Sequence, residues 1–269
     1  MSTLSLTRRD QKLVALFLPE YNNLTSSTYE IKDWPDQSDR KNPAVEAIAF
    51  DQCGSGIAIE HTLIQPFIGE KNDTQPFIAA FRRLEQDCTL HVPEYDITVW
   101  IPVGAIPKGV KWGDVGVKVR EWLLVNKETL PVDRSQHQIP GLPFDLTIFA
   151  DKMELPGHPG TLSLGRCEMP NTFAEVVRKA LRTKLPKLIS TQVEKRILLL
   201  EKDNLPHGYG EIAQSIESME AEFPDLRHID QIWVVNTVAW ETENSLFFYA
   251  VWPGGVGLRF RVTVEGRFA

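Results

Sequence analysis

The sequence predicts an α/β fold with a mixed central sheet flanked by helices. Two observations lead to this prediction. Near the N-terminus, two apolar segments of β character, residues 45–50 and 57–64, flank a turn-forming cluster at residues 52–56 and indicate an antiparallel hairpin. From Asn171 onward, helical and strand-like patterns alternate, which is typical of βαβ units with parallel strands.

The hairpin follows an expected helix and an expected loop. Residues 7–20 carry apolar side chains at helical spacing, with Thr7 as N-cap, and predict an amphipathic helix. Residues 22–43 are polar and contain two prolines, so loop is expected there, with a short strand only at residues 29–34.

Glu60 is an acid among apolar neighbours in the second strand of the hairpin. An ionised carboxylate in such a place is costly unless a cation or a donor meets it. A turn centred near Cys53 puts Glu46 directly across from Glu60, with both side chains on one face about 5 Å apart. Such a pair repels unless one acid is protonated or a divalent cation lies between them, so it is a candidate metal site. Alternatively, Glu46 lies at an exposed strand end and Glu60 pairs with a lysine or arginine.

The middle of the chain is expected to be an insertion, over about residues 90–170, within a single domain. A helix over residues 76–86, with Thr74 as N-cap, precedes a strand over 95–101 and a helix over 114–129. Residues 144–149 and 161–164 are expected to pair as a second hairpin, because the segment DKMELPGHPG between them is rich in turn-forming residues.

The C-terminal part is predicted to be a βαβ unit followed by a hairpin. A helix begins at residue 171 or 172 and runs to about Leu185, where Pro186 interrupts it. Residues 196–201 and 231–238 are predicted to be buried strands around a helix over 211–222. Strands over residues 245–252 and 258–264 close an extension that spans residues 195–269.

The segment IAIEHT around Glu60, an acid on the preceding strand, and a later helix followed by a buried strand together resemble the PD-(D/E)XK, or restriction-endonuclease-like, nucleases. In that family, two acids on neighbouring strands hold Mg²⁺, which activates water for phosphodiester hydrolysis. The resemblance covers about residues 7–67 and 172–201. It implies Mg²⁺ (or Mn²⁺) as cofactor, Glu60 as the second acid and Glu46 as the first, with Asp36 of the Pro35-Asp36 pair as the alternative.

The chain departs from the family pattern at Thr62, which occupies the position of the family's lysine. The resemblance then implies that Lys71, Lys179 or Lys184 supplies this cation. The implied function is a metal-dependent phosphodiester hydrolase acting on DNA. The alternative is a catalytically inactive, nuclease-like binding protein of a defence or regulatory system.

A basic run is the second candidate site. A row of cations in an otherwise acidic chain suits a phosphate backbone, and part of this row lies along one helix face. The alternative is a solvated helix face balanced by Glu175 and Glu194. The basic residues are Arg178, Lys179, Arg182, Lys184, Lys187, Lys195 and Arg196.

Composition limits the other possibilities. The net charge of −7 offers no general attraction for nucleic acid or anionic membranes, so such binding requires a local basic patch. The cysteines, Cys53, Cys88 and Cys167, are widely spaced, which favours reduced thiols in a cytoplasmic protein. No signal peptide and no membrane span are expected. A protein partner is compatible with the sequence, which indicates no oligomeric state.

Overall fold

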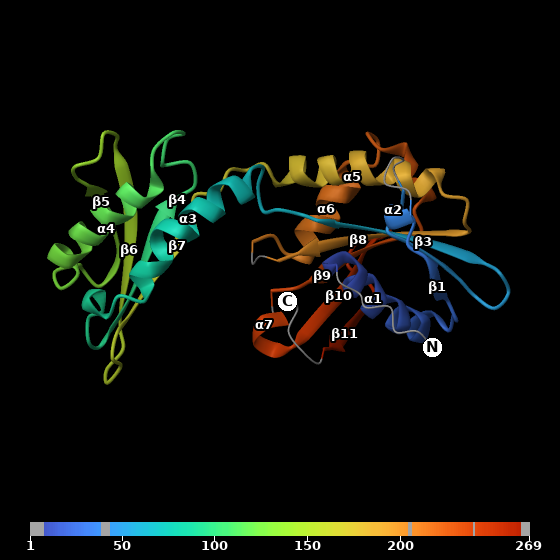
Figure 1. Ribbon diagram of the computed structural model, residues 1–269, viewed down its shortest axis with the longest axis horizontal. Helices are drawn as coiled ribbons and strands as arrows, with labels where there is room; N and C mark the ends of the chain where they lie inside the picture. The colour runs from blue at the N-terminus through green and yellow to red at the C-terminus, as the bar shows by residue number, and fades with distance from the viewer. Residues whose placement is uncertain (1–7, 39–43, 204–205, 239, 265–269) are drawn as a thin grey trace. The chain divides into compact units, whose positions relative to one another are not determined.

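The computed structural model describes residues 8–38, 44–203, 206–238 and 240–264 (Figure 1). The chain divides into two compact units. Unit 1 consists of Met1–Ile68 and Thr172–Ala269, and unit 2 consists of Gly69–Asn171. Both units combine helices with a sheet, so the predicted α/β class is confirmed. Among the described residues, no helix is both long enough and apolar enough to cross a membrane.

Unit 1 contains a mixed sheet of seven strands among its described residues, in the order β1-β2-β3-β8-β9-β10-β11. The central strands β3, β8 and β9 are parallel, and the flanking pairs are antiparallel. The strands are β1 (Glu30–Asp33), β2 (Ala47–Phe50), β3 (Gly56–Leu63), β8 (Lys195–Lys202), β9 (Gln231–Asn236), β10 (Ser245–Trp252) and β11 (Arg259–Thr263).

Helices cover both faces of this sheet (Figure 1). One face packs on α1 (Arg9–Thr25), through side chains such as Ile57 and Ile59. The other face packs on α5 (Phe173–Ser190) and α6 (Tyr209–Ser218), through side chains such as Ala58 and Leu198. The alternation of strand side chains explains why β3 and β8 are apolar on both sides. The short elements are α2 (Pro35–Ser38), η2 (Pro224–His228) and α7 (Trp240–Glu243).

The N-terminal hairpin is confirmed together with its register. Ala47 pairs with Ile59 and Phe50 pairs with Gly56, which is the register that places Glu46 across from Glu60. The parallel pairing of β8 with β9, with α6 between them in sequence, is confirmed as well. These parts were predictable because their signals are local: alternation, a tight turn and a continuous apolar run.

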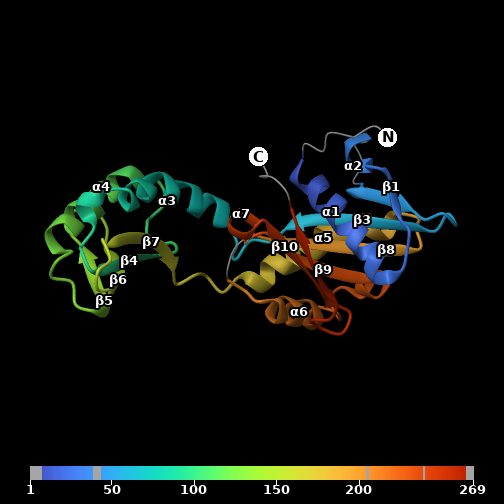
Figure 2. The same cartoon turned by 90° about the horizontal axis from the view of Figure 1, so that it is seen from below.

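Unit 2 is a four-stranded sheet with two helices on one face (Figure 2). The strand order is β5-β6-β4-β7, and only the pair of β4 and β7 is parallel. Unit 2 begins at Gly69, earlier than the expected residue 90, because its first helix packs on its second helix and on β7. The elements are α3 (Glu70–Glu85), η1 (Cys88–Leu90), β4 (Tyr95–Pro102), α4 (Trp112–Asn126), β5 (Asp133–Ile139), β6 (Leu146–Glu154) and β7 (Thr161–Cys167).

The predicted second hairpin is wrong. Strand β4 lies between the two segments, antiparallel to β6 and parallel to β7, so residues 144–149 and 161–164 do not pair with each other. The first part of the supposed turn segment also continues strand β6 to Glu154. The polar strand β5, with only Ile139 buried, gave no apolar signal in the sequence.

Two predicted helix ends are also wrong. Helix α3 begins at Glu70, so Thr74 lies inside it, and the ion pair between Asp73 and Arg166 holds this first turn onto β7. Helix α5 continues past Pro186 to Ser190. Pro186 cannot donate a backbone hydrogen bond within the helix, and the burial of Leu188 offsets this loss. The predicted N-cap Thr7 lies outside the described residues.

Candidate functional site

Glu60 lies fully buried in β3 and points toward α5. Its Oε1 accepts hydrogen bonds from Nζ of Lys184, at 2.5 Å, and from Nζ of Lys187, at 3.1 Å. The two lysines are three residues apart on α5, so they share one face of the helix. The buried carboxylate therefore meets two cations, which is the condition for keeping it ionised away from water.

The second oxygen of Glu60 reaches the neighbouring strand. Its Oε2 accepts the backbone N–H of Glu46 at 3.1 Å. Glu46 lies immediately before β2 and is 8% exposed. The structure thus brings together the two acids that the hairpin register predicted, and it excludes an exposed strand end for Glu46.

The carboxylate of Glu46 belongs to an acidic cluster beside the start of α1. Nη2 of Arg8 is 3.9 Å from its Oε2, and the same guanidinium contacts Asp10 at 2.6 Å and Asp36 at 3.0 Å. Burial, a hydrogen bond with Asp10 and the charge of Glu60 raise the pKa of Glu46 to about 8. At neutral pH, Glu46 therefore carries a proton in the absence of a further cation.

The cations at Glu60 come from α5. Lys184 was one of three predicted sources for the missing family lysine, and its ammonium contacts the carboxylate directly. Lys187, predicted only as a phosphate contact, is the second cation. Of the other two predicted sources, Lys179 is exposed on α5, and Lys71 lies in the first turn of α3 in unit 2.

The chain matches no family model, and no curated protein or solved structure is significantly similar to it. What this site can do therefore follows from its own residues.

The basic run is largely engaged by acids. Arg178 forms ion pairs with Glu175 and, at 2.8 Å, with Glu222, and Arg182 lies 3.3 Å from the same Glu222. Because these arginines are neutralised and the lysines at 184 and 187 face Glu60, the run offers less positive field to a phosphate backbone than its sequence indicates. Lys179 is exposed on the same helix.

The last two residues of the predicted patch have structural contacts. Nζ of Lys195 lies 5.7 Å from the ring centroid of Tyr29. The guanidinium of Arg196 donates to the carbonyl oxygens of Leu188, at 3.0 Å, and Thr191, at 3.1 Å. Arg196 therefore caps the C-terminal end of α5.

Sequence reasoning missed a second buried acid, Glu201, at the end of β8. It faces α1 and is 1% exposed. Its Oε2 lies 3.1 Å from Nε2 of His61, its Oε1 accepts from the hydroxyl of Thr237 at 3.0 Å, and Arg9 forms an ion pair with it. Burial acts to raise the pKa of Glu201, but the bond from His61 and the charge of Arg9 outweigh it, so the pKa is lowered. The only feature of the sequence that could have indicated this buried acid is its position at the end of an apolar strand.

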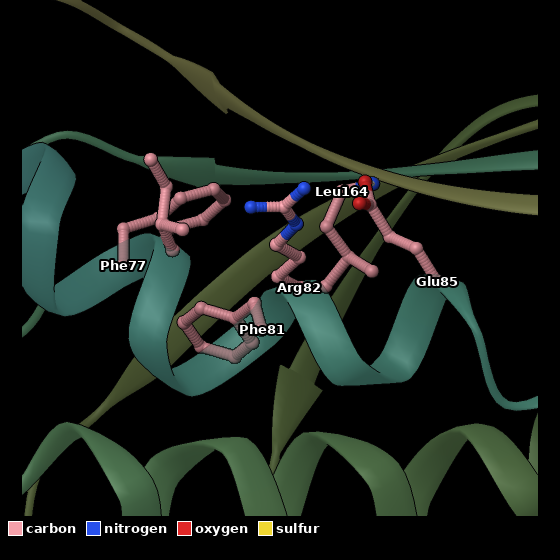
Figure 3. A pocket seen from close by; sticks show the side chains of 6 residues that line it. Phe77, Phe81, Arg82, Glu85 and Leu164 are labelled. Carbon is pink, nitrogen blue, oxygen red and sulfur yellow. Dashed lines mark hydrogen bonds between the residues drawn. The ribbon is translucent and has the colours of Figure 1, made fainter. Parts of the chain in front are cut away.

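A pocket of about 240 Å³ lies in unit 2, between α3 and β7 (Figure 3). The aromatic rings of Phe77 and Phe81 line the pocket. Glu85 and Leu164 line it too, and the carboxylate of Glu85 accepts a hydrogen bond from the backbone N–H of Leu164 at 2.8 Å. It contains no residue of the predicted site.

Proposed function

We propose that unit 1 is a metal-dependent phosphodiester hydrolase that acts on DNA and has a restriction-endonuclease-like core. The observation that carries this proposal is the meeting of Glu46, Glu60 and Lys184 at one place on the sheet. The order of elements supports it: α1, the antiparallel strands β1 to β3, α5, and then β8 parallel to β3. Unit 2 enters this order between β3 and α5.

The donor groups fit a hard divalent cation. Mg²⁺ prefers carboxylate oxygens, and proteins commonly hold it through one or two carboxylates together with water and substrate phosphate. Among the described residues, no set of three or more His, Cys, Asp and Glu side chains is arranged to hold one metal ion. A two-carboxylate site of Glu46 and Glu60 needs no such set. Burial, with smaller effects of Asp10 and Glu60, raises the pKa of Glu46. When bound, the ion would lower the pKa of a water molecule and offset charge on the phosphate.

The residues of the chain have distinct roles in this proposal. Glu60 holds Lys184 and Lys187 side by side, so two ammonium groups meet one carboxylate and leave an excess positive charge for a phosphate oxygen. Glu46, whose pKa is raised, would have to release its proton to hold the cation, so affinity for the metal would increase with pH. Arg8 holds Asp36 and Asp10 beside Glu46.

The test measures metal binding and hydrolysis separately. Mg²⁺ or Mn²⁺ is expected to raise the melting temperature of the wild-type protein, through preferential binding to the folded state. The variant Glu46→Gln is expected to lose this rise and the hydrolysis of plasmid and single-stranded DNA. Glu30→Gln, an exposed acid on β1, is the matched control and is expected to retain both. Wild-type curves that do not change with metal would overturn the proposal.

A second candidate function is DNA binding without catalysis. The observation that favours it is the saturation of Glu60: two lysines contact one oxygen, and a backbone N–H contacts the other. Together with Thr62 at the family's lysine position, this is compatible with a site fixed by an internal ion pair. DNA binding that persists in Glu46→Gln and never requires metal would favour this candidate.

A further inference from the structure

The pocket between α3 and β7 in unit 2 offers a ligand an apolar lining. Phe77, Phe81 and Leu164 line it and are buried in the core of that unit, while Ile78 at its edge is exposed. Its volume is about 240 Å³. An apolar cavity of about 150 Å³ already holds a benzene molecule. The pocket therefore has room for one ring or one branched side chain together with a few polar atoms.

Two side chains of opposite charge line the same pocket. Arg82 and Glu85 both extend from α3 toward β7 (Figure 3). They are three residues apart on the helix, a spacing at which an arginine and a glutamate often pair with each other. No such pair forms here, and the guanidinium of Arg82 has no acid within ion-pair distance among the described residues. One cation and one anion are thus both available to a ligand.

The carboxylate of Glu85 is fixed in place by β7. Its Oε1 accepts the backbone N–H of Leu164 at 2.8 Å. Strand β7 is the last strand of its sheet and pairs with β4, so this N–H points away from the sheet. The second oxygen of Glu85 has no hydrogen-bond donor among the described residues. A group that is held before binding loses little conformational entropy when a ligand arrives.

These groups define the chemistry of a ligand. Its carboxylate can pair with Arg82, its ammonium with Glu85, and its apolar part with the two rings. Residues at this helical spacing have Cβ atoms about 5–6 Å apart, so the two charges of the ligand must also be close together. An α-amino acid carries both charges on one carbon, next to its side chain. A simple carboxylate or amine leaves one protein charge without a partner.

We propose that this pocket binds a free α-amino acid with an apolar side chain. The side chain packs on Phe77 and Phe81, the carboxylate accepts hydrogen bonds from the guanidinium of Arg82, and the ammonium donates to the second oxygen of Glu85. Amino acids with a charged side chain are excluded, because the apolar lining offers that charge no partner. The proposal concerns unit 2 and does not depend on hydrolysis by unit 1.

The test uses the full chain and isothermal titration calorimetry, with L-phenylalanine, L-leucine and L-methionine as probes. At least one of them is expected to bind saturably, and L-glutamate is expected not to bind. Two analogues of the best probe each lack one charge: the N-acetyl derivative has no ammonium, and the amino alcohol has no carboxylate. Each is expected to bind about tenfold more weakly, because one charged hydrogen bond is lost.

Two adjacent arginines of α3 provide matched variants. Arg82 and Arg83 are both exposed, and Arg82 lines the pocket whereas Arg83 does not. Arg82→Gln is expected to weaken binding about tenfold, and Arg83→Gln is expected to stay within twofold of the wild type. Glu85→Gln keeps an oxygen for the N–H of Leu164 but removes the charge. It is expected to weaken the amino acid about tenfold without weakening the N-acetyl derivative further. Melting curves of each variant verify folding.

Three results would overturn the proposal. The first is no saturable binding of any of the three amino acids up to millimolar concentrations. The second is equal affinity for an amino acid and its N-acetyl derivative, which would show that Glu85 does not contact the ammonium. The third is an equal effect of Arg82→Gln and Arg83→Gln, which would place the carboxylate outside this pocket.

Discussion

Lys184 of α5 and Glu60 of β3 form an ion pair of 2.5 Å across 124 positions of sequence. Lys187 contacts the same oxygen at 3.1 Å, while Glu46 reaches the other oxygen through its backbone. The carboxylate thus joins a helix to two strands of the sheet. The arrangement serves stability and, in the proposed hydrolase, the chemistry of the site.

Removal of the Glu60 carboxylate is expected to destabilise the protein strongly. Glu60→Ala leaves two ammonium groups without their partner, and breaking a buried ion pair in this way costs about 3–5 kcal/mol. The lysine side chains are 15% and 17% exposed, so water relieves part of this cost and the lower end of the range is expected. Urea denaturation measures the free energy of unfolding. Lys179→Ala on the same helix is the control, expected within about 0.5 kcal/mol of the wild type. Equal losses in both variants would contradict this account.

The raised pKa of Glu46 makes stability depend on pH. The folded protein holds a proton at Glu46 up to about pH 8, whereas the unfolded chain releases it near the ordinary value of 4.5. Since the folded state binds the additional proton, the contribution to stability is fully present below pH 4.5 and is lost as pH rises through 8. Melting temperatures at pH 5.5 and 8.5 check this. Glu46→Gln, which mimics the protonated acid, is expected to melt above the wild type at pH 8.5 and to lose most of the difference between the two pH values. A wild-type melting temperature that does not fall over this range would refute the assignment.

Sequence reasoning was sufficient for features that depend on neighbouring residues. The tight turn near Cys53 fixed the register of the hairpin, and this register put Glu46 beside Glu60. The apolar residues around Glu60 also indicated that its carboxylate is buried and needs a cation or a hydrogen-bond donor. Both conclusions use alternation and charge burial, which operate within a few residues of the chain.

The features that sequence reasoning missed depend on packing between distant segments. Several lysines in the sequence were candidate partners for Glu60. Only the packing of α5 on the sheet shows that Lys184 and Lys187 are the ones that contact it. Likewise, β4 lies between β6 and β7 in the sheet, and no residue pattern within these strands indicates which strands pair with each other. The positive charge of the basic run is reduced by distant acids: Glu222, 44 and 40 positions from Arg178 and Arg182, pairs with both arginines, and Glu60 pairs with the two lysines.

Two glycines of α4 provide a matched test of helix packing in unit 2. A Cβ at Gly116 would lie 2.7 Å from the carbonyl oxygen of Ala80 on α3, whereas a Cβ at Gly113 meets no atom within 4 Å. Gly116→Ala is expected to lower the free energy of unfolding by about 1–3 kcal/mol, because the two helices must separate. Gly113→Ala is expected to raise it by about 0.5 kcal/mol, because alanine restricts the unfolded chain. Urea denaturation, followed by a signal from unit 2, measures the free energy of unfolding of both variants. Opposite signs are required, and two stabilising substitutions would show that α3 and α4 are not in close contact at Gly116.

The ionised state of Glu201 is expected to support the other face of the sheet. Glu201→Gln retains the shape of the side chain but removes the charge that meets Arg9 and His61, at an expected cost of about 1–3 kcal/mol at pH 7. Because the pKa of Glu201 is lowered on folding, its contribution is present above the ordinary pKa of a glutamate and is lost as pH falls through the folded value. The difference between variant and wild type in urea denaturation is therefore expected to shrink toward acid pH. Glu211→Gln, which removes the half-exposed partner of His207, is the control and is expected to cost less than about 1 kcal/mol. A cost for Glu201→Gln that stays constant down to acid pH would mean that shape rather than charge matters at this position.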